Sequence, residues 1–228
     1  MQTVARIPSY LLETYWWAYV HPRAVRFFER QWLVNLILWG NFARLRDRAL
    51  DALGPSLSGR TLQVACVYGD FTQKAAARLE AGATLDVVDV LPVQLANLRR
   101  KLGAAPGVAL LNRDAAHLGL PDGAYDRAIL FFLLHEMPLE VRRRTLAEAL
   151  RVVKPGGSLV IVDYHRPQRW HPLRRVMTWI LRRFEPYALD LWRHEVAEWM
   201  PSIPASAIAK ETLFGGLYQK LTIQVPEA

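Results

Sequence analysis

The chain has 228 residues, of which 52% are apolar, and it contains one cysteine, Cys66. This length allows one domain, with at most an added lobe, to bury a full hydrophobic core, and the apolar content excludes a disordered protein. A single cysteine excludes a disulfide framework. We see no signal-peptide pattern, and no apolar run reaches the length of about 18 residues that a spanning helix needs, so we expect a cytoplasmic protein.

The net charge of +8 is unevenly distributed. The first sixty residues carry eight lysines and arginines against four acids, whereas residues 61–160 carry twelve against ten. Six arginines and no acid lie between Asp163 and Glu185. Such a basic excess attracts anionic partners. We do not expect nucleic acid among them, because the aromatic residues accompany long aliphatic runs and not an open polar groove.

The first part of the chain is rich in aromatic residues and predicts two or three helices between residues 8 and 53. Turn-forming residues follow at 54–59. We therefore expect an N-terminal helical unit at residues 1–53, which would act as a lid at the substrate or the membrane, and a main domain at residues 54–228.

After residue 60, apolar strand-like segments alternate with helix-like segments. The expected strands are residues 61–68, 83–90, 108–114, 125–136 and 158–165, and the expected helices are residues 72–80, 93–103 and 139–153. This alternation predicts an α/β fold with a parallel sheet that is covered on both faces. Residues 168–200 predict an inserted helical segment, and residues 210–225 predict a hairpin that closes the sheet.

Polar residues follow each expected strand, where an open parallel sheet binds its ligands. These residues are Tyr68, Gly69 and Asp70 after the first strand, Asp89 after the second, Asp114 after the third, His135 and Glu136 after the fourth, and Asp163, Tyr164 and His165 after the fifth. Asp89 suits the two hydroxyls of a ribose, with a helix N-cap as the alternative. Asp114 suits an adenine amino group, with a turn as the alternative.

Two histidines at strand ends each have an acid within two positions. His135, Glu136, Asp163 and His165 could together form a nitrogen and oxygen metal site or an acid–base set, and the alternative is a structural role for each histidine. Cys66 is expected to be a small buried residue within the first strand.

The segments "DVVDV", "NRDAAHLGLPDGAYDRAILFFLLHEMP" and "LAEALRVVKPGGSLVIVDYHRP" resemble class I S-adenosylmethionine-dependent methyltransferases, close to those of quinone and menaquinone biosynthesis. The resemblance implies a Rossmann-like seven-stranded sheet in which the tail hairpin supplies the last two strands. It also implies S-adenosylmethionine as cofactor. The cofactor-binding residues implied are Val67, Tyr68, Gly69, Asp70, Thr72, Asp89, Val90, Asp114 and Ala115.

The first loop departs from that family. Relatives have an acid near the end of the first strand and a G-x-G-x-G loop, but here Gln63 holds the place of the acid, Ala65 and Val67 replace two glycines, and Gly69 remains. A Cβ atom at those positions pushes a ligand outward. We expect the methionine end of the cofactor to sit differently, with support from Tyr68, Asp70 and Thr72; loss of cofactor binding is the alternative.

A narrower resemblance is to the RquA family of rhodoquinone biosynthesis proteins, carried by "VACVYGDFTQ", "LLHEMP", "DYHRPQRWHPLR" and "EPYALDLWRHEVAEW". It implies conversion of ubiquinone to rhodoquinone, in which S-adenosylmethionine donates an amino group in place of a ring methoxy group and manganese(II) is required. The metal ligands would be His135, Asp163 and His165, and the catalytic residues His135, Glu136, Tyr164 and His165, with Glu136 or Tyr164 as the base. The alternatives are a conventional methyltransferase of a prenylated quinol or aromatic compound and a non-catalytic subunit.

The tryptophans fall into two groups, between Trp16 and Trp39 and between Trp170 and Trp199. Tryptophan favours membrane interfaces. The segment "LRRVMTWILRRF" (Leu173–Phe184) has apolar residues at helical spacing and arginines on its other faces, typical of a basic helix on anionic lipid. Packing of its apolar stripe on the sheet is the alternative. We expect peripheral association with the inner membrane, where ubiquinone lies, and the sequence leaves the oligomeric state open.

Overall fold

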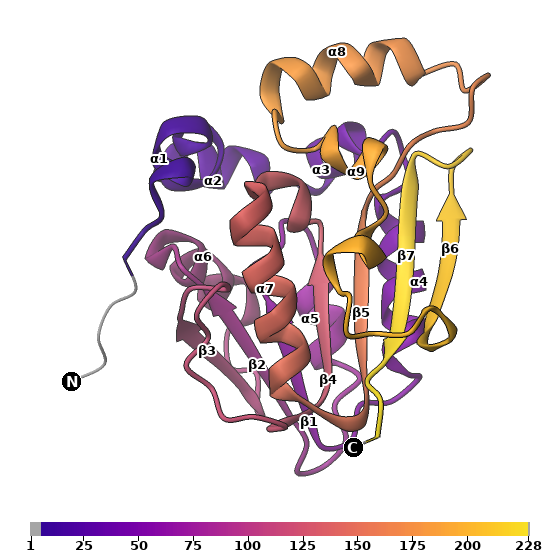
Figure 1. The fold of residues 1–228 in the computed structure, drawn as a ribbon. Coiled ribbons are helices and arrows are strands. Elements are labelled where there is room, and N and C mark those ends of the chain that lie inside the picture. Colours follow the sequence, from indigo (N-terminus) through magenta and orange to yellow (C-terminus); the bar gives the residue numbers. More distant parts are fainter. Residues whose placement is uncertain (1–5, 228) are drawn as a thin grey trace.

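The computed structural model describes residues 6–227 and contains one seven-stranded sheet in the order β3-β2-β1-β4-β5-β7-β6 (Figure 1). The strands are β1 (Arg60–Val64), β2 (Thr84–Asp89), β3 (Val108–Asn112), β4 (Tyr125–Phe131), β5 (Val153–Tyr164), β6 (Ile208–Leu213) and β7 (Tyr218–Gln224). Strands β1 to β5 pair in parallel, and β7 is antiparallel to both of its neighbours. The expected fold and the closing hairpin are confirmed.

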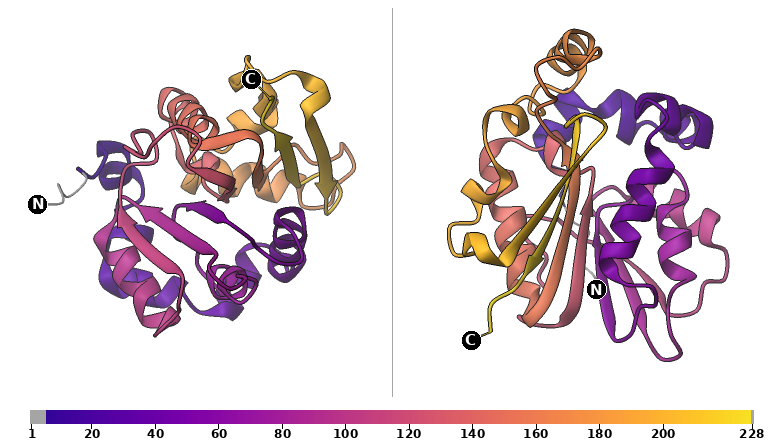
Figure 2. Two further views of the ribbon diagram at one scale, coloured as in Figure 1. Left: turned by 90° about the horizontal axis from the view of Figure 1, so that it is seen from below. Right: turned by 90° about the vertical axis from the view of Figure 1, so that its right-hand side faces the viewer.

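Helices cover both faces of this sheet (Figure 2). Those between the parallel strands are α5 (Phe71–Ala76), α6 (Pro92–Leu102) and α7 (Leu139–Val152). Helix α6 shows why the segment folds as it does: Pro92 has the φ angle that a first helical turn needs, and Gly103 ends the helix at a φ of 57°. Because both faces are covered, β4 and β5 are buried almost continuously in their apolar parts.

The N-terminal part contains α1 (Ser9–Thr14), a π-helical turn η1 (Trp16–Val20), α2 (Pro22–Phe28), α3 (Gln31–Ile37) and α4 (Phe42–Leu53). Helix α4 packs on the sheet, and its buried Leu45, Ala49 and Leu50 belong to the same core as the strands. Helices α1 to α3 instead lie beyond the carboxyl ends of the parallel strands (Figure 1). The N-terminal unit is therefore divided between the core and a cap over the strand ends.

The inserted segment between β5 and β6 contains α8 (Arg174–Phe184), α9 (Asp190–Arg193) and the 3-10 turns η3 (Val196–Trp199) and η4 (Ala205–Ala207). Helix α8 lies at the same end of the molecule as α1 to α3 (Figures 1 and 2). It buries Met177 and Leu181 and leaves Val176 and Trp179 exposed.

Two strands end earlier than the apolar runs that predict them. Strand β1 stops at Val64 because Ala65 adopts a φ of 74°, and β4 stops before Phe132, which adopts a φ of 54°. Positive φ angles turn the chain out of the sheet. The residues that follow, including the 3-10 turn η2 (Leu134–Glu136), therefore form loops over the carboxyl edge of the sheet.

Candidate active site

Two cavities meet at the carboxyl ends of the strands. The small cavity, of about 70 Å³, lies over the ends of β1 to β3, with Asp89 and Asp114 in its wall. The large cavity, of about 540 Å³, lies between the strand ends, the N-terminal cap and α8. Its walls are mostly aromatic and aliphatic and include Trp17, Phe28 and Trp39. The small cavity thus offers carboxylates, and the large cavity offers a mostly apolar surface with a few polar side chains.

The loop after β1 is supported from inside by Gln63, which is fully buried. Its side-chain amide donates to the carbonyl of Ala65 (3.0 Å), and its amide oxygen accepts from the hydroxyl of Thr72 (3.0 Å). Gln63 therefore holds the turn at Ala65. It presents no carboxylate at the end of β1, and its polar atoms are already engaged.

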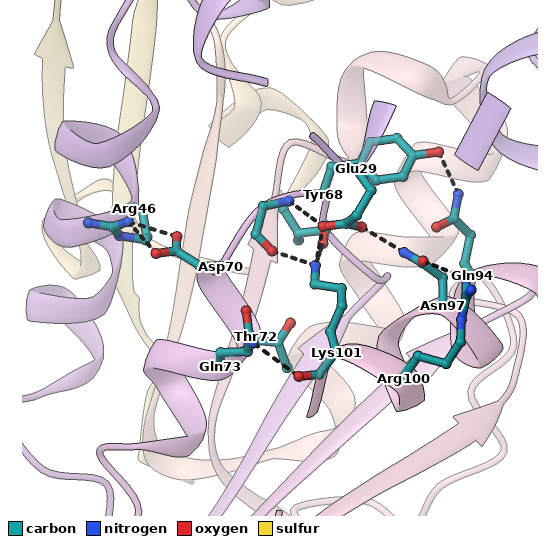
Figure 3. Close-up of polar contacts among 12 residues, drawn as sticks. Glu29, Arg46, Tyr68, Asp70, Thr72, Gln73, Gln94, Asn97, Arg100 and Lys101 are labelled. Atoms are coloured by element: carbon teal, nitrogen blue, oxygen red, sulfur yellow. Dashed lines mark hydrogen bonds and ion pairs between the residues drawn. The ribbon is translucent and has the colours of Figure 1, made fainter. Parts of the chain in front are cut away.

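The same loop is held from outside by Glu29, at the end of α2. The Glu29 carboxylate accepts from the backbone N–H of Gly69 (3.0 Å) and from the side-chain amide of Asn97 (2.6 Å). It also pairs with the ammonium of Lys101 (2.5 Å), which donates in turn to the carbonyl of Gly69. Figure 3 shows Asn97 and Lys101 converging on Glu29. A residue of the N-terminal cap thus fixes the loop after β1, and no sequence pattern marked this residue.

The remaining loop residues point to other partners. The Tyr68 hydroxyl donates to the carbonyl of Ala18 (2.8 Å) and accepts from Gln94 (2.9 Å). Asp70 forms a bidentate contact with Arg46 of α4 (2.7 and 2.9 Å; Figure 3). Of the cofactor residues expected in this loop, Val67 and Tyr68 line the large cavity, whereas Gly69, Asp70 and Thr72 line neither cavity.

The small cavity brings together the other four expected cofactor residues, Asp89, Val90, Asp114 and Ala115. The Asp89 carboxylate accepts from the backbone N–H groups of Cys66 and Leu91, both at 2.8 Å. Burial raises the pKa of Asp89 to about 6, although these hydrogen bonds act in the opposite direction. Asp114 accepts from the N–H of Ala116 at 2.9 Å, so it also has the turn role that was the alternative for it.

Cys66 lies outside the strand in which the sequence placed it. Because Ala65 ends β1, Cys66 is in the loop and lines both cavities. Burial raises the pKa of its thiol well above the usual value, so it is a neutral wall residue. Pro8, Tyr10 and Leu11 form another part of the small cavity that the sequence did not indicate.

His135 and Asp163 form a buried pair at the edge of the large cavity. The Nδ1 atom of His135 lies 3.0 Å from Asp163, whose carboxylate also accepts from the N–H groups of Leu134 (2.8 Å), His135 (3.3 Å) and Tyr164 (2.7 Å). Burial lowers the pKa of His135, but the charges of Asp163, Glu185 and Glu136 outweigh it and raise the pKa to about 9. The imidazole is therefore cationic at neutral pH.

Three further polar side chains surround this pair. Glu136 lies 3.8 Å from the Nε2 atom of His135 and lines both cavities. Tyr164 packs edge-on against the His135 ring at 5.0 Å, and burial raises its pKa well above the usual value. Glu185, which precedes Pro186 after α8, also faces the large cavity, and burial raises its pKa. Glu185 begins the segment "EPYALDLWRHEVAEW" of the narrower resemblance, but its place at the cavity depends on the fold of the insert and was not predicted.

His165 lies apart from this group. Its Nδ1–H donates to the carbonyl of Gly216 (2.9 Å), and its Nε2 accepts from Lys210 (3.0 Å). These bonds tie His165 to the β6–β7 hairpin, and it lines neither cavity. The expected metal set of His135, Asp163 and His165 is thus not assembled, and among residues 6–227 no group of three potential metal ligands is close enough to hold an ion. These residues do not fit manganese(II) as placed.

Comparisons with known proteins agree with this architecture. Residues 61–157 match the family described as "Methyltransferase domain". The chain is 28% identical over 202 residues to a demethylmenaquinone methyltransferase of Renibacterium salmoninarum, covering 80% of this chain and 81% of that one. It is 30% identical over 139 residues to the ubiquinone/menaquinone biosynthesis C-methyltransferase UbiE of Ectopseudomonas mendocina, covering 59% and 54%.

A solved structure shares the fold. This structure is the N-methyltransferase NodS from Bradyrhizobium japonicum WM9 in complex with S-adenosyl-L-homocysteine. The TM-score is 0.55 and the sequence identity is 18%, and the match covers 80% of this chain and 87% of that one. At this identity the likeness concerns the fold alone. Taken with the matched segment and the strand order, it shows that the chain has the class I methyltransferase fold, a Rossmann-like seven-stranded sheet.

Proposed function

We propose that the protein transfers a group from S-adenosylmethionine to the ring of a prenylated quinone, and that this group is an amino group that replaces a ring methoxy group, as in the conversion of ubiquinone to rhodoquinone. One observation carries the proposal: the small and large cavities share the lining residues Cys66, Gln94, Phe132 and Glu136. A donor in the small cavity would meet an acceptor in the large cavity across these side chains. The relatives named above support the same substrate class.

The residues of the small cavity fit the cofactor. Asp89 and Asp114 follow the adjacent strands β2 and β3, where carboxylates suit ribose hydroxyls and an adenine amino group. Each Asp89 oxygen accepts one backbone hydrogen bond and keeps a further acceptor site. The cavity, at about 70 Å³, is smaller than the roughly 300–1,000 Å³ of typical ligand sites. Binding therefore requires its outer wall, which contains Tyr10 and Leu11, to move outward.

The large cavity fits a quinone ring and the first part of an isoprenoid tail. Its volume of about 540 Å³ falls within the usual range for ligand sites of about 300–1,000 Å³. Aromatic rings from Trp17, Phe28 and Trp39 offer flat apolar surfaces, and His135 and Glu136, whose side chains lie 3.8 Å apart, add polar groups to the lining. Such a cavity would orient the ring by its polar edge and leave the tail against apolar walls.

The polar groups have distinct roles in this proposal. Bound S-adenosylmethionine would supply the transferred group. As a nitrogen attacks the ring carbon that bears the methoxy group, negative charge develops on a neighbouring carbonyl oxygen, and cationic His135 stabilises it by donating from Nε2. Asp163 keeps the imidazole oriented. Glu136 would accept the proton released by the nitrogen, and the departing methoxide would take up a proton and leave as methanol. The bond between this nitrogen and the α-carbon of the cofactor would then break: the α-proton is lost, the quinone ring takes up two electrons and becomes a quinol, and water releases the carbon chain of the cofactor as a 2-oxo acid. No step runs through manganese, because the expected ligand set is not assembled.

Gln63 favours amination over methylation. The strand-one acid of class I relatives would hold the α-amino group of the cofactor, but here both polar atoms of the Gln63 side chain are bound to Ala65 and Thr72. The α-amino nitrogen would then remain available for reaction. A Gln63→Glu variant that keeps full amination activity would contradict this step.

Transfer of a methyl group to a quinol ring is the second candidate, because the UbiE relative is named a C-methyltransferase. Purified protein and a short-tailed ubiquinone, or its quinol, would be incubated with S-adenosylmethionine carrying nitrogen-15 in its amino group or carbon-13 in its methyl group, with and without manganese(II). Mass spectrometry of the quinone then separates the candidates. We expect a product that contains nitrogen-15 and has lost one methoxy group.

Two variants sharpen this experiment. Glu136→Gln should lower the rate by at least about 100-fold, the usual contribution of a positioned base. His194→Gln changes an exposed histidine outside both cavities and should leave the rate unchanged. A carbon-13 methyl product without nitrogen would establish methyl transfer instead. An unchanged quinone, under conditions in which the cofactor binds, would refute both candidates.

A further inference from the structure

Helix α8 and the N-terminal cap lie at one end of the molecule (Figure 2), and both carry large apolar side chains that are exposed. Trp170 is 88% exposed, Trp179 64%, Leu36 62% and Trp32 57%. Single exposed apolar residues are common, but a group of them at one end of a protein marks an interaction site. Burial accounts for only one stripe of α8: Met177 and Leu181 are buried and line the large cavity, whereas Trp179 of the same helix is exposed.

These residues continue into the rim of the large cavity. Leu36, Ile37 and Trp39 of the α3 region, Trp17 of the π-helical turn and Phe184 of α8 all line the large cavity and are each at least 36% exposed. The cavity therefore opens to the outside through an apolar rim. A hydrocarbon tail could leave the cavity there without crossing a polar surface.

Exposed arginines lie on α8, which forms part of this rim, and on or next to α2, the helix between the other rim segments in sequence. Arg175, Arg182 and Arg183 are exposed on α8, and Arg23, Arg26 and Arg30 are exposed on or next to α2. Among residues 6–227, none of these six arginines forms an ion pair with a carboxylate. No acidic residue lies between Asp163 and Glu185 to offset the charge on α8. Arginines without carboxylate partners, next to exposed tryptophans, complement a surface that has anionic groups on its outside and an apolar layer below them.

We propose that this surface, formed by α8 and the α2–α3 region, docks on a bilayer that contains anionic phospholipid, so that the mouth of the large cavity faces the acyl chains. The inference rests on the proposed function, because it gives the prenyl tail of the substrate its path. Tryptophan rings would lie at the headgroup level and arginines would contact lipid phosphates. The contact is peripheral: within residues 6–227, no helix has the length and apolar content needed to span a membrane.

Vesicle co-sedimentation tests the surface without cofactor or quinone. The purified protein would be mixed with vesicles of phosphatidylcholine alone or with vesicles that contain about one third phosphatidylglycerol, an anionic lipid whose surface potential attracts basic side chains. We expect binding to the anionic vesicles that weakens with added salt, and little binding to phosphatidylcholine.

Charge reversal on α8 gives the decisive comparison. Arg182→Glu/Arg183→Glu should weaken binding to anionic vesicles by roughly 30-fold or more, since each basic residue near such a surface contributes about a factor of five. The control Lys74→Glu/Arg144→Glu makes the same change of charge on α5 and α7, which cover the sheet, and should bind nearly as wild type. If the α8 variant unfolds, Trp170→Ser/Trp179→Ser provides a second test and should weaken binding about tenfold or more.

Three results would overturn the docking surface: wild-type protein that stays in the supernatant with both vesicle types, equal losses in the α8 variant and its control, or tighter binding to duplex DNA than to anionic vesicles. Failure of the docking proposal can be distinguished from failure of the proposed function. Vesicle binding is measured without quinone, and quinone amination is measured with a short-tailed substrate in detergent.

Discussion

Replacing Glu29 by glutamine tests whether the N-terminal cap holds the cofactor loop. Glutamine keeps the shape of the side chain and one acceptor oxygen for the N–H of Gly69. It removes the charge that pairs with Lys101, whose side chain is only 15% exposed. Lys101 would then keep carbonyl oxygens as partners but lose its carboxylate.

The size of the effect follows from this loss. A hydrogen bond to a charged group contributes about 1.5–3 kcal/mol, and breaking a fully buried pair costs about 3–5 kcal/mol. Because Glu29 and Lys101 are partly exposed, at 18% and 15%, we expect a loss of about 2 kcal/mol in the free energy of unfolding. In a domain of this size that corresponds to a fall in Tm of roughly 4–8 °C. If binding of the cofactor must restore the ordered loop, the same free energy is lost from binding, and the cofactor affinity would fall by up to about 30-fold.

Calorimetric titration with S-adenosylmethionine and thermal unfolding measure the two effects. Glu13→Gln, an exposed glutamate of α1, is the matched control and should change neither. In a double-mutant cycle with Lys101→Met, the second substitution should cost much less once Glu29 is gone. Wild-type Tm and cofactor affinity in Glu29→Gln, or additive losses in the double variant, would refute the role of this contact.

Three further predictions concern the site and its supports. Cofactor affinity should fall as the pH drops through about 6, because Asp89 becomes protonated and loses acceptor capacity, and Asp89→Asn should bind weakly at every pH in titrations between pH 5 and 8. The pKa of His135 is raised from 6.5 to about 9, so its contribution to stability is complete below pH 6.5 and is lost as the pH rises through about 9. In urea unfolding, the free energy of unfolding should fall by up to about 3 kcal/mol over that window. The His135→Gln variant should not show this fall. Gly69→Ala places a Cβ atom 2.5 Å from the Phe42 ring at a φ of 82°, and it should lower the free energy of unfolding by about 2–4 kcal/mol in the same assay. The control is Gly82→Ala, which has a similar φ of 79° but open space around it, and it should lower the free energy of unfolding by about 1–2 kcal/mol.

The sheet could be predicted from the sequence because its signals are local. Apolar runs, helical spacing and turn residues mark β1 to β5 and the β6–β7 hairpin, and the resemblance implied that they form one seven-stranded Rossmann-like sheet. The positions of Asp89 and Asp114 followed from the same rule, since parallel strands present their carboxyl ends at one edge. Strand ends were less predictable: Ala65 and Phe132 adopt positive φ angles that no residue type at those positions indicates.

The contacts of the site residues could not be predicted, because they depend on segments far apart in sequence. Glu29 meets Gly69 across forty positions, and nothing in the N-terminal pattern distinguishes it from a surface glutamate. His165 follows an apolar strand just as His135 does, yet it binds Gly216 of the β6–β7 turn and Lys210 of β6, away from the cavities. A histidine at the end of a strand therefore predicts a position at the edge of the sheet, but it does not predict which residue the imidazole will bind.

The N-terminal cap contributes residues to both cavities and to the loop after β1, which the sequence analysis described as separate features. It supplies Tyr10 and Leu11 to the small cavity, Glu29 to the cofactor loop, and Leu36 and Trp39 to the exposed rim of the large cavity. If the rim docks on anionic lipid, docking and cofactor binding act on the same segment. Coupled binding is reciprocal, so anionic vesicles should change the cofactor Kd by the same factor by which the cofactor changes the vesicle affinity.

We expect this coupling to be positive, because the cap must move for the cofactor to enter and lipid would hold the moved cap. The cofactor Kd, measured by titration with and without anionic vesicles, should be several-fold lower with vesicles, and phosphatidylcholine alone should have no effect. Glu29→Gln should reduce the factor, since it loosens the connection between the cap and the loop. Equal cofactor affinity with and without anionic vesicles, in a protein that binds those vesicles, would show that the rim and the loop act independently.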